Sequence, residues 1–139
     1  MEQLIIDTIL QKTVDLFAEH ENIKIELINN NDSETKIMGD VEQLTRVFNN
    51  IIKNALQSIP SEREGIIVVE LSHVGNKCQI SISDNGEGIA EDILDKIFVP
   101  NFTTKSSGSG LGLAMVKQIV NAHQGEISFE TEIDKGTTF

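Results

Sequence analysis

The chain has 139 residues, of which 39% are hydrophobic and 24% charged, a composition typical of one globular domain. Its 11 Lys and Arg against 22 Asp and Glu give a net charge of −11, which lacks the basic footprint of a nucleic-acid-binding protein, so we expect no nucleic-acid partner. No apolar run approaches the ~18 residues of a membrane span, no basic leader opens the chain, and the single cysteine, Cys78, cannot form an internal disulfide. We therefore expect a cytoplasmic location, with any membrane anchor of a longer protein upstream of Met1.

The N-terminal half predicts two helices around a strand. Residues 2–19 carry apolar side chains at roughly helical spacing and predict the first helix. Residues 23–28, IKIELI, alternate and predict a strand. Asp40 is a suitable N-cap for a long helix over 41–58, which Pro60 ends.

Two strands follow, over 66–72 (IIVVELS) and 78–83 (CQISIS), with Gly75-Asn76 as the expected hairpin turn. A hairpin joins antiparallel strands, so this part of the sheet is expected to be antiparallel.

The C-terminal half predicts a short helix over 90–97, an irregular stretch over 98–110 and a helix over 111–123. Residues 126–132 predict another strand, and the terminal GTTF looks like the start of one more. Helices and strands thus mix without strict β-α-β alternation. We therefore predict an α+β fold, a two-layer sandwich in which helices cover one face of a mostly antiparallel sheet.

The long helix carries a stripe of amides at the edge of its apolar face. Asn50, Asn54 and Gln57 follow the i, i+4, i+7 spacing and lie next to Val47 and Ile51 on a helical wheel. Amide carbonyl oxygens at such a boundary could ligate a hard cation. The alternative is that they are ordinary surface polar residues.

A carboxylate follows the strand over 78–83. Alternation places Asp84 on the same side as the apolar Ile80 and Ile82. A carboxylate in an apolar pocket is costly unless it accepts a hydrogen bond, and an adenine amino group is a suitable donor. Gly86 and Gly88 would let the backbone approach the base closely. The alternative is a plain Asp-Asn-Gly turn that closes a strand.

A glycine-rich segment, FTTKSSGSGLGL over 102–113, precedes the last predicted helix. Free N–H groups at a helix N-terminus and flexible glycines suit phosphate binding, and Lys105, Thr103 and Thr104 add donors beside them. The segment is neither a Walker A loop nor a convincing Rossmann fingerprint. The alternative is a flexible surface loop before a helix.

In this order, the segments resemble the GHKL ATPase superfamily and, within it, sensor histidine kinases. FNNIIKNALQSI (48–59) is similar to their N box, DNGEGI (84–89) to the G1 box, IFVPNFTTK (97–105) to the F box and GSGLGLAMVKQIV (108–120) to the G2 box. The resemblance covers essentially the whole chain, residues 1–139. It implies a single domain with the Bergerat-type α/β sandwich that binds ATP and Mg²⁺.

The resemblance also implies a role for each matching position. Asp84 would accept the adenine amino hydrogen bond, Asn54 would ligate Mg²⁺ with help from Asn50, and residues from about 98 to 109 would form a mobile ATP lid. Lys105 would reach phosphate, which makes Asn50, Asn54 and Lys105 the catalytic set. The other implied cofactor-binding residues are Gly86, Gly88, Ile89, Phe98, Thr103, Thr104, Gly108, Gly110, Leu111 and Gly112.

Two positions depart from the commonest histidine kinase pattern. Gln57 stands where many of these kinases have a Lys, and the NALQSI form together with FTTK is similar to the nitrogen-regulation subgroup. Asn101 replaces the first phenylalanine of that subgroup's PFFTTK, which implies looser packing of the lid.

The histidine that a complete kinase phosphorylates is not evident. His20, His73 and His123 do not lie on a long helical hairpin, so we expect them to be structural or surface residues and the chain to be a fragment. The resemblance then implies transfer of the ATP γ-phosphoryl group to a histidine on a separate helical dimerisation domain, with a response regulator as the downstream partner. One alternative is a GHKL ATPase module, disfavoured because no Glu occurs at 46–53; the other is a degenerate nucleotide-binding scaffold.

Overall fold

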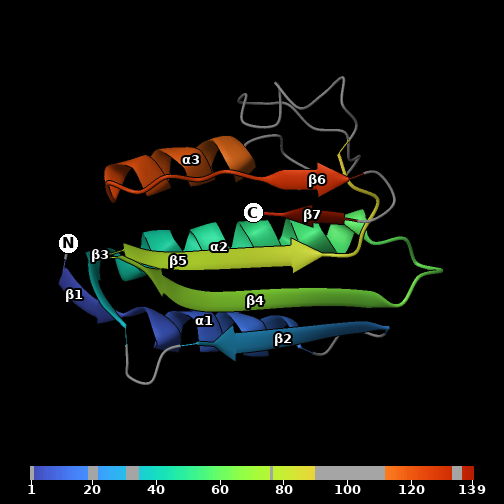
Figure 1. The fold of residues 1–139 in the computed structure, drawn as a ribbon, viewed down its shortest axis with the longest axis horizontal. Coiled ribbons are helices and arrows are strands. Elements are labelled where there is room, and N and C mark those ends of the chain that lie inside the picture. Colours follow the sequence, from blue (N-terminus) through green and yellow to red (C-terminus); the bar gives the residue numbers. More distant parts are fainter. Residues whose placement is uncertain (1, 19–21, 31–34, 76, 90–111, 133–135) are drawn as a thin grey trace.

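The computed structural model contains seven strands and three helices in the part of the chain that it describes (Figure 1). The described residues are 2–18, 22–30, 35–75, 77–89, 112–132 and 136–139. The elements are β1 (Glu2–Ile5), α1 (Ile6–Phe17), β2 (Ile23–Asn29), β3 (Lys36–Gly39), α2 (Val41–Ser58), β4 (Gly65–Val74), β5 (Lys77–Asp84), α3 (Gly112–Ala122), β6 (Glu130–Glu132) and β7 (Gly136–Thr138).

The strands form one main sheet and a small two-stranded one. The main sheet has the order β2-β4-β5-β7-β6, in which β2 and β4 are parallel and every other pair is antiparallel. The parallel pair is possible because β3 and α2 provide the long crossover from β2 to β4. Strands β1 and β3 pair antiparallel beside it. The three helices lie on one side of the main sheet (Figure 1), so the predicted two-layer α+β sandwich is confirmed.

The core lies between the sheet and the helices. Strand alternation turns Ile67 and Leu71 of β4 toward the helices, and both are fully buried. Ile52 of α2, Leu10 of α1 and Val116 of α3 are buried against the same face. Each side chain of this size contributes about 1.5–3 kcal/mol through the burial of apolar surface. All three helices are thereby fixed to the sheet.

Two predicted boundaries are wrong and one prediction remains open. Residues 2–5 form β1 rather than the first turns of a helix, because they pair with β3 over the register Glu2↔Gly39 to Ile5↔Lys36. A strand is predicted over 126–132, but only its last three residues form one, β6. These are the residues that pair with β7, over the register Glu130↔Thr138 to Glu132↔Gly136. The short helix predicted over 90–97 lies outside the described residues. The helix predicted over 41–58 is confirmed as α2.

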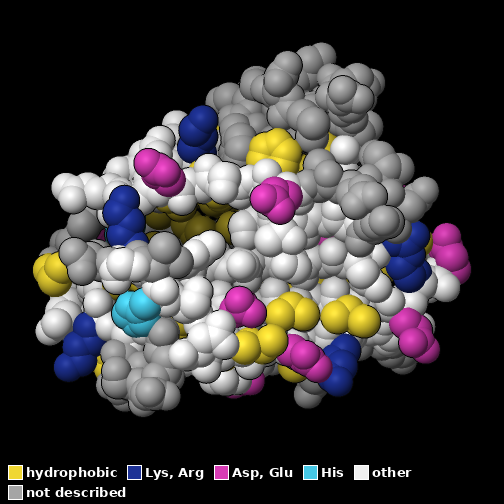
Figure 2. Space-filling model, in the orientation of Figure 1, with side chains coloured by type: hydrophobic (Ala, Val, Ile, Leu, Met, Phe, Trp, Pro, Cys, Tyr) yellow, Lys and Arg dark blue, Asp and Glu magenta, His cyan; other side chains and the backbone are white. Residues whose placement is uncertain are grey.

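The outer face of the sheet is mixed in character. Figure 2 shows several hydrophobic side chains next to one another on the lower part of this face, with acidic and basic side chains around them. Ile66 of β4 is half-exposed there. Among the helices in the described ranges, none is both long and apolar enough to cross a membrane.

Candidate functional site

Helix α2 positions the predicted amide stripe. The Asp40 carboxylate caps this helix by accepting the Gln43 N–H at 3.1 Å. Asn50 and Asn54 lie half-exposed at the border of the apolar face, as predicted, and Gln57 is exposed. The Asn50 amide nitrogen donates to the Arg46 carbonyl oxygen at 2.8 Å. That bond uses the nitrogen end of the side chain and leaves Oδ1 as the end that can ligate a cation.

His123 connects α2 to α3. The Asp40 backbone N–H donates to His123 Nε2 at 3.1 Å, so this nitrogen is unprotonated. The ring proton therefore lies on Nδ1, which donates to the Ile119 carbonyl oxygen at 2.8 Å. His123 thus holds the end of α3 against the start of α2. This is a structural role, as predicted for this histidine.

Asp84 ends β5 on the side of the sheet that faces the helices. Its Oδ1 accepts two backbone hydrogen bonds, from the Gly86 N–H at 2.8 Å and from the Thr137 N–H at 3.3 Å. Thr137 belongs to β7, the neighbouring strand, and is buried. The carboxylate is therefore held both by its own loop and by the adjacent strand. This two-sided support makes Asp84 more than the end of a simple turn.

The loop after Asp84 is fixed to the end of α2. The Glu87 N–H donates to the Ser58 carbonyl oxygen at 2.9 Å. Gly86 lies so close to α2 that a Cβ atom there would be 2.6 Å from the Ser58 carbonyl oxygen. Gly88 has φ of +79°, a conformation that favours glycine. Both glycines are therefore required by the path of this loop.

Two side chains that the sequence analysis did not single out also hold this loop. Arg63 Nη1 donates to the carbonyl oxygens of Asn85 at 2.6 Å and Gly86 at 3.0 Å. The Asn85 side chain accepts the Ile66 N–H at 2.8 Å and donates to the Glu64 carbonyl oxygen at 2.9 Å. No sequence motif marks Arg63, because its partners are backbone atoms brought near by the fold. Asn85 lies within the DNGEGI segment, directly after Asp84. Its position there is all that the sequence offers to suggest that its side chain holds the loop.

Cys78 plays no part in this site. Burial raises the pKa of its thiol above the ordinary value, and the carboxylate of Asp7 raises that pKa further. Both effects keep the thiol protonated and therefore poorly nucleophilic. Cys78 instead packs against the hydrophobic core.

The predicted lid lies outside the described residues. This applies to the predicted site residues Phe98, Thr103, Thr104, Lys105, Gly108, Gly110 and Leu111. Ile89 is the last described residue before that segment, and Gly112 is the first residue of α3 after it.

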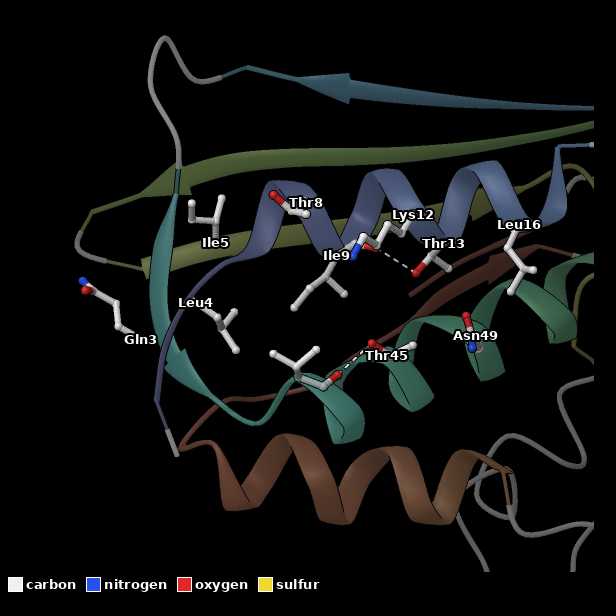
Figure 3. Close-up of a pocket in the computed structure, with 11 residues that line it drawn as sticks. Gln3, Leu4, Ile5, Thr8, Ile9, Lys12, Thr13, Leu16, Thr45 and Asn49 are labelled. Carbon is white, nitrogen blue, oxygen red and sulfur yellow. Dashed lines mark hydrogen bonds between the residues drawn. The ribbon is translucent and has the colours of Figure 1, made fainter.

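A groove of about 530 Å³ lies elsewhere, between α1, α2 and β1 (Figure 3). Leu16 and Val41 on its walls are exposed apolar residues. Asn49, which follows Phe48 on α2, also lines it, and its Oδ1 is buried without a hydrogen-bond partner in the described part of the chain. None of the predicted site residues lines this groove, whose lining is Gln3, Leu4, Ile5, Thr8, Ile9, Lys12, Thr13, Leu16, Val41, Thr45 and Asn49.

The Asn49 oxygen gives a stability prediction. Asn49→Leu is expected to raise the free energy of unfolding by about 1 kcal/mol, because it removes a buried acceptor without a partner and improves helix propensity. Urea unfolding followed by circular dichroism measures the change, and nucleotide affinity serves as the control and should be unaltered. A destabilised Asn49→Leu variant would show that the oxygen is satisfied in solution.

Comparisons with known proteins agree with this arrangement. The family model described as "Histidine kinase-, DNA gyrase B-, and HSP90-like ATPase" matches residues 39–139. The chain is 40% identical over 136 residues to the sensor histidine kinase ZraS of Escherichia coli K12, which covers 96% of this chain and 29% of ZraS. It therefore spans less than a third of the length of this relative.

Solved structures of histidine kinases share the fold. The nucleotide-free catalytic domain of histidine kinase ThkA superposes with a TM-score of 0.86 at 25% identity, covering 99% of this chain and 93% of that one. Full-length ShkA in complex with AMPPNP superposes with a TM-score of 0.83 at 26% identity, covering 98% of this chain and 29% of that one. Together with the match over residues 39–139, these likenesses show that the chain belongs to the family of histidine kinase-, DNA gyrase B- and HSP90-like ATPases.

Proposed function

We propose that the chain is the Mg·ATP-binding catalytic domain of a sensor histidine kinase. ATP binding follows from the ATPase family to which the chain belongs. The observation that carries the proposal is the Asp84 carboxylate, fixed at the end of β5 by two backbone N–H groups beside the C-terminal end of α2. The 40% identity to the sensor histidine kinase ZraS favours a kinase over other members of the family.

Asp84 is suited to recognise adenine. A carboxylate can accept about four hydrogen bonds, and the N–H groups of Gly86 and Thr137 supply two of them, both to Oδ1. The 6-amino group of adenine is a donor that would add a charge-assisted hydrogen bond to this carboxylate. Gly86 lets the adjacent loop lie against the end of α2, and Gly88 supplies the positive φ that the path of this loop requires.

Mg²⁺ would lie at the amide stripe of α2. Asn50 and Asn54 are one helical turn apart at the border of the apolar face, and the Asn50 nitrogen is already used by the Arg46 carbonyl oxygen. Their amide oxygens suit a hard cation that also takes phosphate oxygens as ligands. When bound, the ion would offset the charge of the triphosphate on a protein of net charge −11.

The remaining site roles are proposed from the sequence segments alone. Residues from about 98 to 109 would close over the triphosphate, and Lys105 would contact its phosphates. Phe98 would pack the lid, while hydroxyl and backbone groups of the segment would surround the phosphates. These further positions are Thr103, Thr104, Gly108, Gly110, Leu111 and Gly112, with Ile89 beside the base.

In the proposed reaction, a ring nitrogen of the acceptor histidine bonds to the γ-phosphorus as the bond to the β–γ bridging oxygen breaks. ADP leaves and the ring loses a proton. Positioning and charge stabilisation supply most of the catalysis in such transfers. The acceptor histidine would lie on a helical dimerisation domain, and a response regulator would be the later recipient. Membership of the nitrogen-regulation subgroup is a narrower proposal that rests on NALQSI and FTTK.

Calorimetric titration of the chain with AMPPNP, with Mg²⁺ and with EDTA, tests the binding step. We expect the affinity to be at least about tenfold higher with Mg²⁺, equivalent to about 1.4 kcal/mol. Absence of binding in both conditions would instead indicate a degenerate scaffold.

A second assay tests the transfer step. The chain is mixed with γ-labelled ATP and a purified histidine-bearing helical hairpin domain from a sensor kinase. Acid-labile label on that domain is the expected result. Phosphate release without labelling would contradict the kinase proposal and favour a GHKL ATPase module.

A further inference from the structure

Arg63 contacts the loop that follows Asp84, over residues 85–89, from outside the proposed adenine site. This half-buried residue lies in the connection between α2 and β4, where its own N–H donates to the Pro60 carbonyl oxygen at 3.0 Å. Its Nη1 donates to the carbonyl oxygens of Asn85 and Gly86, at 2.6 and 3.0 Å. A guanidinium is charged at every physiological pH, so these are charge-assisted hydrogen bonds.

The first of these bonds fixes the direction of the Gly86 N–H. The carbonyl of Asn85 and the N–H of Gly86 belong to one peptide unit, and in a planar trans peptide they point in opposite directions. When Arg63 holds the Asn85 oxygen, the Gly86 N–H must point away from Arg63. It points to Asp84 Oδ1, which accepts it at 2.8 Å.

The next peptide is held in the same way. The Gly86 carbonyl oxygen accepts from Arg63, and the N–H of Glu87 on the opposite side donates to the Ser58 carbonyl oxygen at 2.9 Å. Two consecutive peptide planes are thus fixed at both ends. The Asn85 side chain fixes the loop to the start of β4 through Ile66, but it does not set the direction of these two peptides.

We propose that Arg63 is a positioning residue for adenine recognition, which acts by orienting the Asn85–Gly86 peptide so that its N–H directs the Asp84 carboxylate toward the base. The inference rests on the proposed role of Asp84 in binding adenine. Arg63 itself touches only backbone oxygens of the loop among its described contacts. It acts through Asp84, so its effect should depend on both Asp84 and the 6-amino group.

The test is a double-mutant cycle read by calorimetry. Wild type, Arg63→Ala, Asp84→Asn and the double variant are titrated with Mg·ATP and with purine riboside triphosphate, which lacks the 6-amino group. We expect Arg63→Ala to weaken ATP binding about tenfold and purine riboside triphosphate binding less than about threefold. In the Asp84→Asn background, the further loss on Arg63→Ala should shrink to within about twofold, because coupled residues are not additive.

Lys77→Ala is the charge control. Lys77 is exposed at the start of β5, at the opposite end of that strand from Asp84, so this variant removes one positive charge away from both the loop and the amide stripe of α2. It should bind both nucleotides within about twofold of wild type. Arg63→Gln is titrated in parallel as a milder variant, and its losses should follow the same pattern at smaller size.

The amide proton of Gly86 gives a readout in the nucleotide-free chain. Hydrogen bonding to a carboxylate moves such a proton downfield, so Arg63→Ala and Arg63→Gln should move its resonance upfield. Equal losses for both nucleotides, a loss that persists in the Asp84→Asn background, or an unmoved Gly86 resonance would each overturn the inference while the role of Asp84 stands. No nucleotide binding by the wild type would overturn the proposed function and the role of Arg63 with it.

Discussion

Asp84→Asn is expected to lower the affinity for Mg·ATP by about 100-fold while the fold is retained. A hydrogen bond to a charged group contributes about 1.5–3 kcal/mol, and a mismatched buried donor adds a further cost. The carboxylate of Asp84 receives backbone N–H groups from Gly86 and Thr137, and adenine would bring a third donor.

The amide that replaces the carboxylate cannot accept from all three donors in either orientation. If its oxygen faces Gly86 and Thr137, its NH₂ group faces the adenine amino group, and two donors oppose each other. If the amide is rotated by 180°, the NH₂ group faces the two backbone N–H groups instead. Both arrangements leave buried donors without an acceptor, so loss of binding is expected even though Asn is nearly the same size.

Asp40→Asn is the matched control for this experiment. It makes the same chemical change and the same change in charge, but at the N-cap of α2, where Asn caps a helix as well as Asp does. Calorimetry should show ATP binding within about twofold of wild type for Asp40→Asn. If Asp84→Asn binds as tightly as Asp40→Asn, Asp84 does not contact the base.

The regular parts of this fold could be predicted from local sequence patterns. Helix α2 has a long apolar period, a suitable N-cap at Asp40 and a proline after its end, and its predicted bounds are confirmed. The side of Asp84 follows from strand alternation with Ile80 and Ile82. In contrast, the prediction of a helix over Glu2–Ile5 is wrong. The apolar pair Leu4-Ile5 fits a helix and a strand equally well, and it is the pairing with β3 that makes this segment a strand.

The supports of the candidate site could not be predicted in this way. Thr137 reaches Asp84 because β7 lies beside β5, a neighbour relation that the chain order does not reveal. The Arg63 side chain donates to backbone oxygens of the loop, and the Ser58 backbone carbonyl accepts from the loop. Backbone partners of this kind carry no residue-specific sequence pattern. The sequence therefore predicts the groups proposed to touch the nucleotide, whereas the groups that orient them emerge only from the fold.

Gly86→Ala is expected to lower the free energy of unfolding by about 2 kcal/mol and to weaken Mg·ATP binding at least about tenfold. The new Cβ would meet the Ser58 hydroxyl first and would also lie 2.6 Å from the carbonyl oxygen and 2.8 Å from the carbonyl carbon of Ser58. The hydroxyl can rotate, but the carbonyl belongs to the backbone of α2 and cannot move aside. The loop must therefore move away and lose the Glu87–Ser58 hydrogen bond. Asp84 then loses the N–H that orients it.

Two further variants separate this cause from others. A Cβ at Gly75 meets nothing within 4 Å, and its φ of +63° makes Gly75→Ala a measure of backbone strain alone, with a cost of about 1–2 kcal/mol and unchanged ATP affinity. Ser58→Ala removes the hydroxyl but not the carbonyl, so it should not restore ATP binding to Gly86→Ala. If Ser58→Ala does restore binding, the obstruction lies in the flexible hydroxyl and the loop does not depend on contact with the backbone of α2. Urea unfolding and calorimetry on Gly86→Ala, Gly75→Ala and the double variant Ser58→Ala/Gly86→Ala therefore show whether the close approach of Gly86 to α2 is what places Asp84.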